Sequence, residues 1–184
     1  MYNPATLLPG DVLLMTSRTG ENIKAGLLDK LISFSEGSPL VHAAIVGEGH
    51  IVNPVWRVER APLSIYAPNG WAFRVSATDA QRSTAVRWAE AHIGNTYGTA
   101  EILADAARFN LHFVLPSWYR WRPQHWTCSG FVAQAYLAAG VELTKAPVPA
   151  PVDLGYSPLL IGRRPWDPLE GWKPIARRHR TSSR

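Results

Sequence analysis

The chain contains a single cysteine, and the position of that residue gives it chemical interest. Cys128 stands in the segment WTCSGF, at the start of a stretch whose apolar spacing predicts a helix over residues 128–139. In the first turn of a helix the backbone N–H groups lack intrahelical acceptors and the dipole is positive, so a thiolate is stabilised there. The same N–H groups can stabilise an oxyanion during acyl transfer, which makes Ser129 a candidate substrate or oxyanion contact. A buried, unreactive cysteine is the alternative interpretation.

A histidine could serve as the base for such a thiol. His42 stands in the segment VHAAIV, a polar ring at the start of an otherwise apolar strand. Burying an imidazole costs free energy unless it finds hydrogen-bond partners, so a satisfied core histidine is the ordinary interpretation. Together with a cysteine at a helix start, His42 is predicted to take the thiol proton and return it to the leaving group.

A third polar residue is expected beside His42. The glycine turn at residues 47–49 folds the strand that ends in Asn53 back alongside the strand that begins with His42. The amide oxygen of Asn53 could then accept the second ring proton and hold the imidazole in one tautomer. Because Asn53 precedes a proline, a simple role in a turn is the alternative.

Other histidines are weaker candidates. His125, three residues before Cys128, competes with His42 as the base, although the members of a triad are usually distant in sequence. The remaining candidates lack the spacing of metal ligands, so we expect no metal and no cofactor: His50, His92 and His112.

The surrounding pattern indicates an α+β fold. Strands are predicted at residues 11–15, 40–46, 50–53 and 71–75, with an extended piece around 55–60. Helices are predicted at 22–34, 78–93, 99–109 and 128–139, the second of them opened by a capping box of Thr78 and Gln81. Residues 110–126 form an aromatic, proline-containing loop, and the chain after Thr144 is expected to be irregular.

Composition and charge limit the classes of protein that fit. The 184 residues suit one domain, and one cysteine excludes both an internal disulfide and a zinc site built on cysteines. The net charge of +5 belongs to residues 163–184, which hold seven Lys/Arg and two acids, while residues 1–162 are neutral. We therefore expect a catalytic domain at 1–162 and a basic tail at 163–184. The tail could touch an anionic polymer or a membrane surface, without specific nucleic-acid recognition, or could simply be a solvated terminus.

The sequence shows no targeting segment. No apolar run reaches the roughly 18 residues that span a bilayer, and no basic n-region precedes an apolar stretch at the N-terminus. We therefore expect a cytoplasmic protein, or a phage-associated one released by a route other than the Sec pathway.

Three segments together resemble a known family. LPGDVLL and VHAAIVGEGHIVN resemble the strand pair of NlpC-type cell-wall cysteine peptidases, and TCSGFVA resembles the nucleophile helix of that family. Here the histidine precedes the cysteine by 86 positions, the reverse of the usual order. The chain thus resembles the circularly permuted branch, which includes YiiX-like amidases and peptidases and uncharacterised bacterial and phage hydrolases. That branch is related to the lecithin:retinol acyltransferases.

The resemblance implies a fold and a set of site residues. The fold would be a circularly permuted papain-like one, with a small antiparallel sheet packed against helices and the nucleophile at a helix N-terminus. Cys128 would be the nucleophile, His42 the base and Asn53 the third catalytic residue. Tyr97, in the segment IGNTYG, resembles the Gly-x-x-Tyr element of the family and would be an auxiliary oxyanion or substrate contact, with a packed tyrosine as the alternative. Many relatives have His or Glu in place of Asn53, and Asn can orient the imidazole but adds no negative charge.

The implied activity is that of a cysteine amidase or peptidase. It would act through a thioester acyl-enzyme on a cell-wall peptide or a related amide. An acyltransferase or lipid esterase would use the same residues, and a non-catalytic phage or cell-wall module could keep the same fold.

Overall fold

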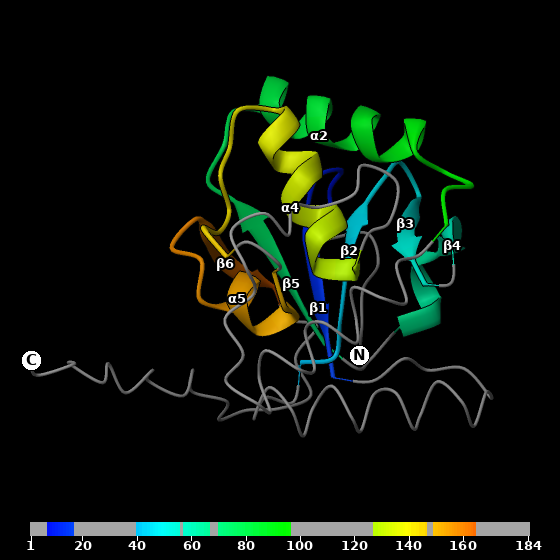
Figure 1. The fold of residues 1–184 in the computed structure, drawn as a ribbon, viewed down its shortest axis with the longest axis horizontal. Coiled ribbons are helices and arrows are strands. Elements are labelled where there is room, and N and C mark those ends of the chain that lie inside the picture. The colour runs from blue at the N-terminus through cyan, green and yellow to red at the C-terminus, as the bar shows by residue number, and fades with distance from the viewer. Residues whose placement is uncertain are drawn as a thin grey trace, which may run out of the picture.

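The structure, a computed structural model, describes residues 7–16, 40–55, 57–66, 70–96, 127–146 and 149–164. Within these residues the chain forms a six-stranded sheet in the order β4-β3-β2-β1-β5-β6, with every neighbouring pair antiparallel (Figure 1). The strands are β1 Val12–Met15, β2 His42–Val46, β3 His50–Pro54, β4 Val58–Pro62, β5 Gly70–Val75 and β6 Leu160–Arg164. A 3₁₀ turn, η2 Leu63–Tyr66, follows β4. The predicted α+β class is confirmed.

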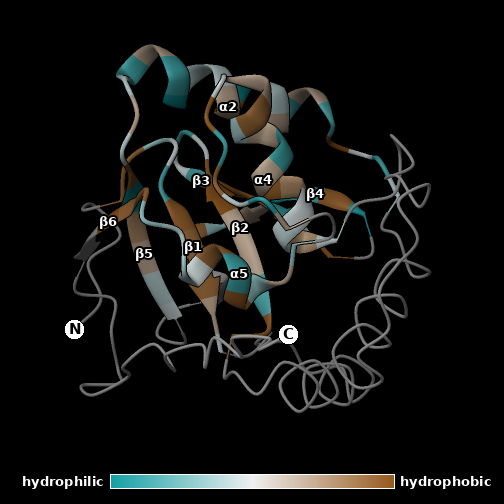
Figure 2. Ribbon diagram, turned by 60° about the vertical axis from the view of Figure 1, so that its left-hand side comes forward, coloured by the Kyte–Doolittle hydropathy of each residue, from teal (hydrophilic) through white to brown (hydrophobic). Residues whose placement is uncertain are grey.

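The central strands are buried on both faces. Every residue of β1 and β2 is buried, which explains why VLLM and HAAIV are continuous apolar runs rather than alternating patterns. One apolar cluster lies between the sheet and two helices, α2 Asp79–Ala91 and α4 Cys128–Ala138. A second cluster, which includes Leu13, Met15 and Ala44, lies on the opposite face of the sheet. Figure 2 shows the hydrophobic residues gathered along these central strands and on the adjacent helix faces.

The helix α2 begins as its sequence predicts. The hydroxyl of Thr78 accepts the N–H of Gln81, and the Gln81 side chain accepts the N–H of Thr78, which completes the expected capping box. Ala85 and Ala89 are buried in the apolar cluster between this helix and the sheet. Trp88 stacks on His92, with ring centroids 3.8 Å apart, and also contacts Phe131 of α4.

The helix α4 carries Cys128 as its first residue. Its buried face includes Phe131, Val132, Ala135 and Tyr136, which follow one another at helical spacing. It ends at Gly140, whose φ of 74° lies in the left-handed region that favours glycine. The N–H groups of Gly140 and Val141 bond back to the carbonyls of Leu137 and Tyr136, both at 2.9 Å, and close a Schellman motif.

The expectation of an irregular chain after Thr144 is wrong. A short helix, α5 Pro151–Gly155, begins with a proline at its first position, and Asp153 accepts the N–H of Ala150 at 3.0 Å. The strand β6 then pairs with β5 and forms the edge of the sheet, with Leu160 opposite Val75. The residues of β6 show no apolar alternation that would predict a strand. The strand forms because it pairs with β5, which is far away in the sequence.

Some expectations fall on other parts of the chain. The strand β6 runs through the expected domain boundary at 162/163, so the first two residues of the supposed tail, Arg163 and Arg164, belong to the sheet. The rest of the tail lies outside the described residues, as do the predicted helices at 22–34 and 99–109 and the aromatic loop at 110–126. Among the helices that the structure describes, none is long and apolar enough to cross a membrane.

Candidate functional site

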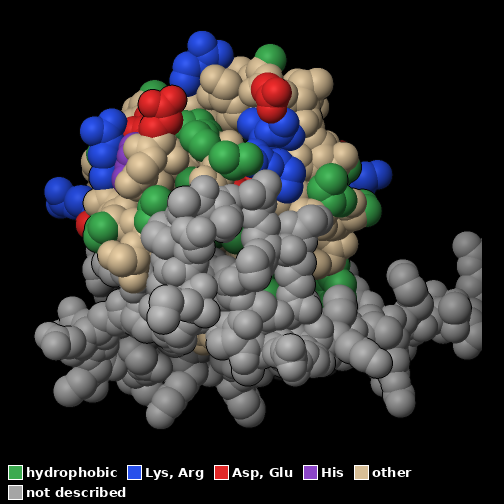
Figure 3. Space-filling model, turned by 180° about the vertical axis from the view of Figure 1, so that it is seen from behind, with side chains coloured by type: hydrophobic (Ala, Val, Ile, Leu, Met, Phe, Trp, Pro, Cys, Tyr) green, Lys and Arg blue, Asp and Glu red, His purple; other side chains and the backbone are tan. Residues whose placement is uncertain are grey.

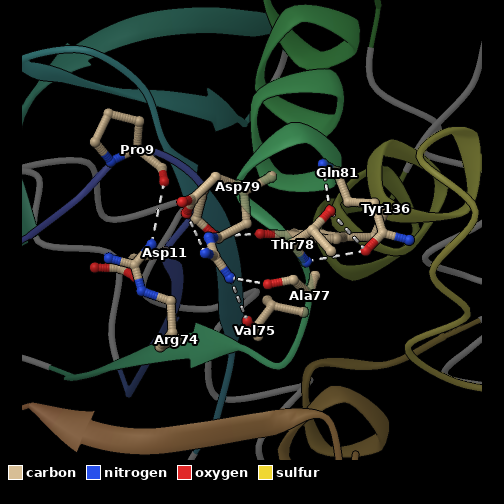
Figure 4. A network of polar contacts seen from close by, with 11 residues as sticks. Pro9, Asp11, Arg74, Val75, Ala77, Thr78, Asp79, Gln81 and Tyr136 are labelled. Atoms are coloured by element: carbon tan, nitrogen blue, oxygen red, sulfur yellow. Dashed lines mark hydrogen bonds and ion pairs between the residues drawn. The ribbon is translucent and has the colours of Figure 1, made fainter.

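The turn before β1 anchors the sheet to the helix that bears Cys128. In the segment LPGD, the carboxylate of Asp11 accepts the N–H of Leu8 at 2.8 Å and pairs with Arg74 of β5 at 3.1 Å (Figure 4). Asp11 is fully buried, so its charge needs these partners. The turn residues thus fix β1 against β5.

Tyr136 ties α4 to the same turn. Its hydroxyl donates to the carbonyl of Gly10, which lies next to Asp11. Burial, reinforced by the negative charge of Asp11, raises the pKa of Tyr136, so the hydroxyl remains a donor throughout the physiological range. Arg82 of α2 donates to the carbonyls of Val75 and Ala77 beside this contact (Figure 4). The network therefore sets how α4 lies on the sheet.

Cys128 is the first residue of α4 and is 3% exposed. The hydroxyl of Thr127 caps the helix by accepting the N–H of Gly130 at 3.1 Å. The first helical bond runs from the N–H of Phe131 to the carbonyl of Thr127 at 2.8 Å, so the N–H of Ser129 has no acceptor within the helix. The helix start thus combines a thiol with a backbone donor that is suited to a developing oxyanion.

The Ser129 hydroxyl has a structural partner. It donates to the carbonyl of Pro149 at 2.6 Å, and Thr127 donates to the same carbonyl at 3.4 Å. These bonds clamp the first turn of α4 to the segment that precedes α5. Any contact of Ser129 with an oxyanion would therefore use its backbone N–H rather than its hydroxyl.

His42 and Asn53 meet across two strands. Asn53 Oδ1 lies 2.8 Å from His42 Nε2, and the two side chains are 1% and 0% exposed. In the β2–β3 register Ile45 faces Val52, which makes His42 and Asn53 diagonal neighbours on one face of the sheet. The glycine turn that predicts this approach has Gly49 at a φ of 72°. The structure thus brings these two candidate residues together.

Cys128 and His42 belong to neighbouring elements. The helix α4 packs on the face of the sheet that contains Ala43 and Ile45. His42 lies opposite Met15 in the β1–β2 register and so shares a face with the second apolar cluster. Both residues are the first of their elements, and Figure 1 shows α4 and β2 running in the same direction, side by side.

Glu59 is a polar neighbour that the sequence analysis missed. It lies opposite Asn53 in the β3–β4 register, and the Nδ2 group of Asn53 donates to Glu59 Oε1 at 3.4 Å. The sequence does contain two charged residues, Glu59 and Arg60, in the strand that follows the strand of Asn53. The register of that strand could not be assigned from the sequence, and register decides which residue faces Asn53.

A second cluster of ionisable groups lies on the helix side of the sheet. Glu90 of α2 contacts both His50 of β3 and Arg60 of β4, in the latter case at 2.7 Å. Burial opposes ionisation of Glu90, but the hydrogen bonds from Arg60 and His50 outweigh it and lower the pKa of the carboxyl. This cluster joins the β2–β3 hairpin and β4 to α2.

A cavity of about 1130 Å³ opens beside that cluster. Its lining includes Arg74, Arg82 and Glu90, but not Cys128 or His42. Figure 3 shows acidic and basic side chains interspersed on the visible surface of the molecule on this side. Most of its arginines are already paired with carboxylates, so the cavity offers no obvious anion site: Arg60 with Glu90, Arg74 with Asp11, and Arg82 with Asp79.

Other candidates fall outside the part that the structure describes, namely Tyr97, His112 and His125. His92, which is described, bonds the carbonyl of Trp88 at 2.7 Å. Within the described residues no three His, Cys, Asp or Glu side chains are grouped closely enough to hold a metal ion.

Comparison with known proteins gives a match at the level of the fold. No protein-family model matches the chain, and no curated protein matches its sequence. The crystal structure of the metalloprotein yiiX from Escherichia coli O157:H7 is similar, with a TM-score of 0.60 and 16% identity. The match covers 83% of this chain and 94% of that one. At this identity the similarity shows a shared fold.

Proposed function

We propose that the protein is a cysteine hydrolase in which Cys128 is the nucleophile, His42 the general base and Asn53 the residue that orients His42. The observation that carries the proposal is the buried hydrogen bond between Asn53 Oδ1 and His42 Nε2. It is supported by the placement of Cys128 at the start of a helix that packs on the strand of His42.

The hydrogen bond selects one tautomer of His42. A carbonyl oxygen can only accept, so Nε2 must carry a proton to bond with Asn53 Oδ1. In the neutral ring Nδ1 then has the lone pair and is the atom that can take the thiol proton. This is the division of roles that an acid–base histidine needs.

The reaction follows from these roles. Nδ1 of His42 takes the proton from the thiol of Cys128, and the sulfur attacks the carbonyl carbon of the amide. The backbone N–H of Ser129 donates to the oxyanion that forms. The C–N bond breaks as His42 gives its proton to the leaving amine, which leaves a thioester on Cys128. Water, deprotonated by His42, then hydrolyses the thioester to a carboxylic acid and restores the thiol.

The proposal places a geometric demand on the fold. Because α4 covers the face opposite to that of His42, the thiol and the imidazole would meet around the end of the sheet rather than through it. His42 is the first residue of β2 and Cys128 is the first residue of α4, so both lie at the ends of their elements rather than in the middle. The chain order, with His42 and Asn53 before Cys128, accords with a permuted papain-like fold.

The substrate class rests on the resemblance to NlpC-type enzymes. We propose a cell-wall peptide or a related amide. An acyl ester is the substrate of the rival activity, acyl transfer or lipid hydrolysis, which would use the same three residues. The assay must therefore contain both classes.

The test is to trap the acyl-enzyme. Purified protein is offered wall stem peptides and, separately, long-chain acyl esters, and its mass is followed with Cys128→Ala as the negative control. Cleavage of peptides with an acyl adduct on Cys128 supports the proposal. Turnover of esters alone would replace the amidase with an acyl-ester enzyme. Equal turnover in wild type and Cys128→Ala would refute the role of Cys128, whereas His92→Gln, a matched histidine change on α2, should remain active.

A further inference from the structure

The carboxylate of Glu59 lies next to the side-chain amide of Asn53. The two residues lie opposite each other in the β3–β4 ladder, so their side chains leave the same face of the sheet. Asn53 Nδ2 donates to Glu59 Oε1 at 3.4 Å, a long bond whose strength depends on the charge of the carboxylate. Glu59 forms no ion pair within the described part of the chain. Among the described residues, the Glu59 side chain forms one hydrogen bond, the bond with Asn53.

This contact favours one orientation of the Asn53 amide. The oxygen and nitrogen of an asparagine amide have nearly the same shape, so its hydrogen-bond partners determine the orientation. A carboxylate can only accept, and it therefore selects the orientation in which Nδ2 faces Glu59. The oxygen is then left to face His42, as observed at 2.8 Å.

The orientation of the amide in turn decides the tautomer of His42. With Oδ1 toward the ring, Nε2 carries the proton and Nδ1 can act as a base. If the amide turned over, its N–H would face Nε2, and a ring that accepts at Nε2 carries its proton on Nδ1. Such a ring could not take a proton from Cys128.

Glu59 also places a negative charge beyond the neutral amide. Asn53 has no charge with which to stabilise an imidazolium, but a carboxylate bonded to its Nδ2 polarises the amide and strengthens Oδ1 as an acceptor. Glu59 is exposed, so solvent screens its charge and the effect on His42 must be modest.

We propose, on the basis of the function proposed above, that Glu59 is a positioning residue that holds the Asn53 amide so that His42 keeps its Nε2–H tautomer. In this role Glu59 acts through Asn53 and not on the substrate or the thiol. The three side chains form a line across β2, β3 and β4 in which each sets the orientation of the next.

The experiment reads the tautomer directly. The ¹⁵N chemical shifts of the His42 ring are measured at a pH at which the ring is neutral, in wild type, Glu59→Ala and Glu59→Gln. They are assigned by their loss in His42→Gln. Glu48→Gln, which removes an exposed charge at the hairpin end of β2, is the matched control. We expect the Nε2–H form in wild type and in the control, and a rise of the Nδ1–H form in Glu59→Ala.

Kinetics gives the second readout. We expect Glu59→Ala to lower kcat roughly 2- to 10-fold with KM unchanged, the range expected for one modest hydrogen bond. Glu59→Gln, which keeps an oxygen acceptor, should recover part of the loss. If Glu59 were only a surface residue, Glu59→Ala would change neither kcat nor the tautomer of His42.

The two proposals can fail separately. If His42 keeps the same tautomer in Glu59→Ala, the inference about Glu59 is overturned, whether or not the protein is active. If wild type turns over no substrate while the tautomer still depends on Glu59, the positioning role stands and the proposed hydrolase activity fails.

Discussion

Asn53 Oδ1 lies 2.8 Å from His42 Nε2 in the interior of the protein, as a diagonal pair across β2 and β3. An imidazole at the start of an apolar strand would be costly without such a partner. The bond satisfies Nε2 of the ring, and in the proposed mechanism Nδ1 is the atom that takes the thiol proton. The consequences can be measured residue by residue.

Replacing Asn53 with alanine should lower kcat about 10- to 100-fold, because His42 loses the acceptor that fixes its tautomer. Steady-state kinetics on the substrate found by acyl-enzyme trapping measures the loss. Asn53→Asp keeps an acceptor but places a carboxylate against Glu59, so the double variant with Glu59→Gln should be more active than Asn53→Asp alone. Equal activity of these two variants would argue against the line from His42 to Glu59.

Ser129→Ala separates a structural clamp from a substrate contact. The variant removes the 2.6 Å bond to the Pro149 carbonyl and should lower the free energy of unfolding by about 1–2 kcal/mol. We expect kcat/KM to change by less than about threefold, because the backbone N–H of residue 129 remains. Urea denaturation gives the stability, with the exposed Ser83→Ala of α2 as control. A large loss of activity without a loss of stability would show that the hydroxyl contacts the substrate.

Tyr136 should make the stability depend on alkaline pH. Its pKa is raised in the folded protein, so above its usual value of about 10 the unfolded chain releases the proton before the folded one does. The stabilisation that protonated Tyr136 gives to the folded protein is therefore fully present below pH 10 and is lost as the pH rises toward the pKa of Tyr136 in the folded protein. In Tyr136→Phe the free energy of unfolding should fall less steeply above pH 10. The variant should also be about 1 kcal/mol less stable at pH 7, because the carbonyl of Gly10 loses its hydrogen-bond donor. Urea denaturation at pH 7 and pH 10.5, with Tyr156→Phe as control, measures both effects. An unchanged decline in Tyr136→Phe would contradict the assignment.

Local sequence patterns were enough to predict the helix and strands that hold the candidate site residues. The capping pair at residue 78 and the glycine turn between β2 and β3 are short-range patterns, and each lies where it was expected. The apolar spacing after residue 127 places Cys128 at a helix start, and the glycine turn folds the strand of Asn53 back on that of His42. These features could be read without any knowledge of the remaining chain.

The features that were missed depend on distant partners. The strand β6 exists because β5 offers an edge some ninety residues earlier, and the bond from Ser129 to Pro149 joins two separate segments. Glu59 faces Asn53 only in one register of β3 against β4, and a shift of one residue would turn it to the other face. Alternation within a single strand does not contain this information.

The pairing of Cys128 with His42 is tested most directly by the rate at which iodoacetamide alkylates Cys128 as a function of pH. If His42 takes the thiol proton, wild type should react at pH 6 at least tenfold faster than a free thiol, because such a thiol is mostly protonated there. His42→Ala should return the profile to that of an ordinary cysteine, while His92→Gln should leave it unchanged. A wild-type rate that follows a free thiol across the whole range, or a fast rate that survives His42→Ala, would contradict the assignment of His42 as the base.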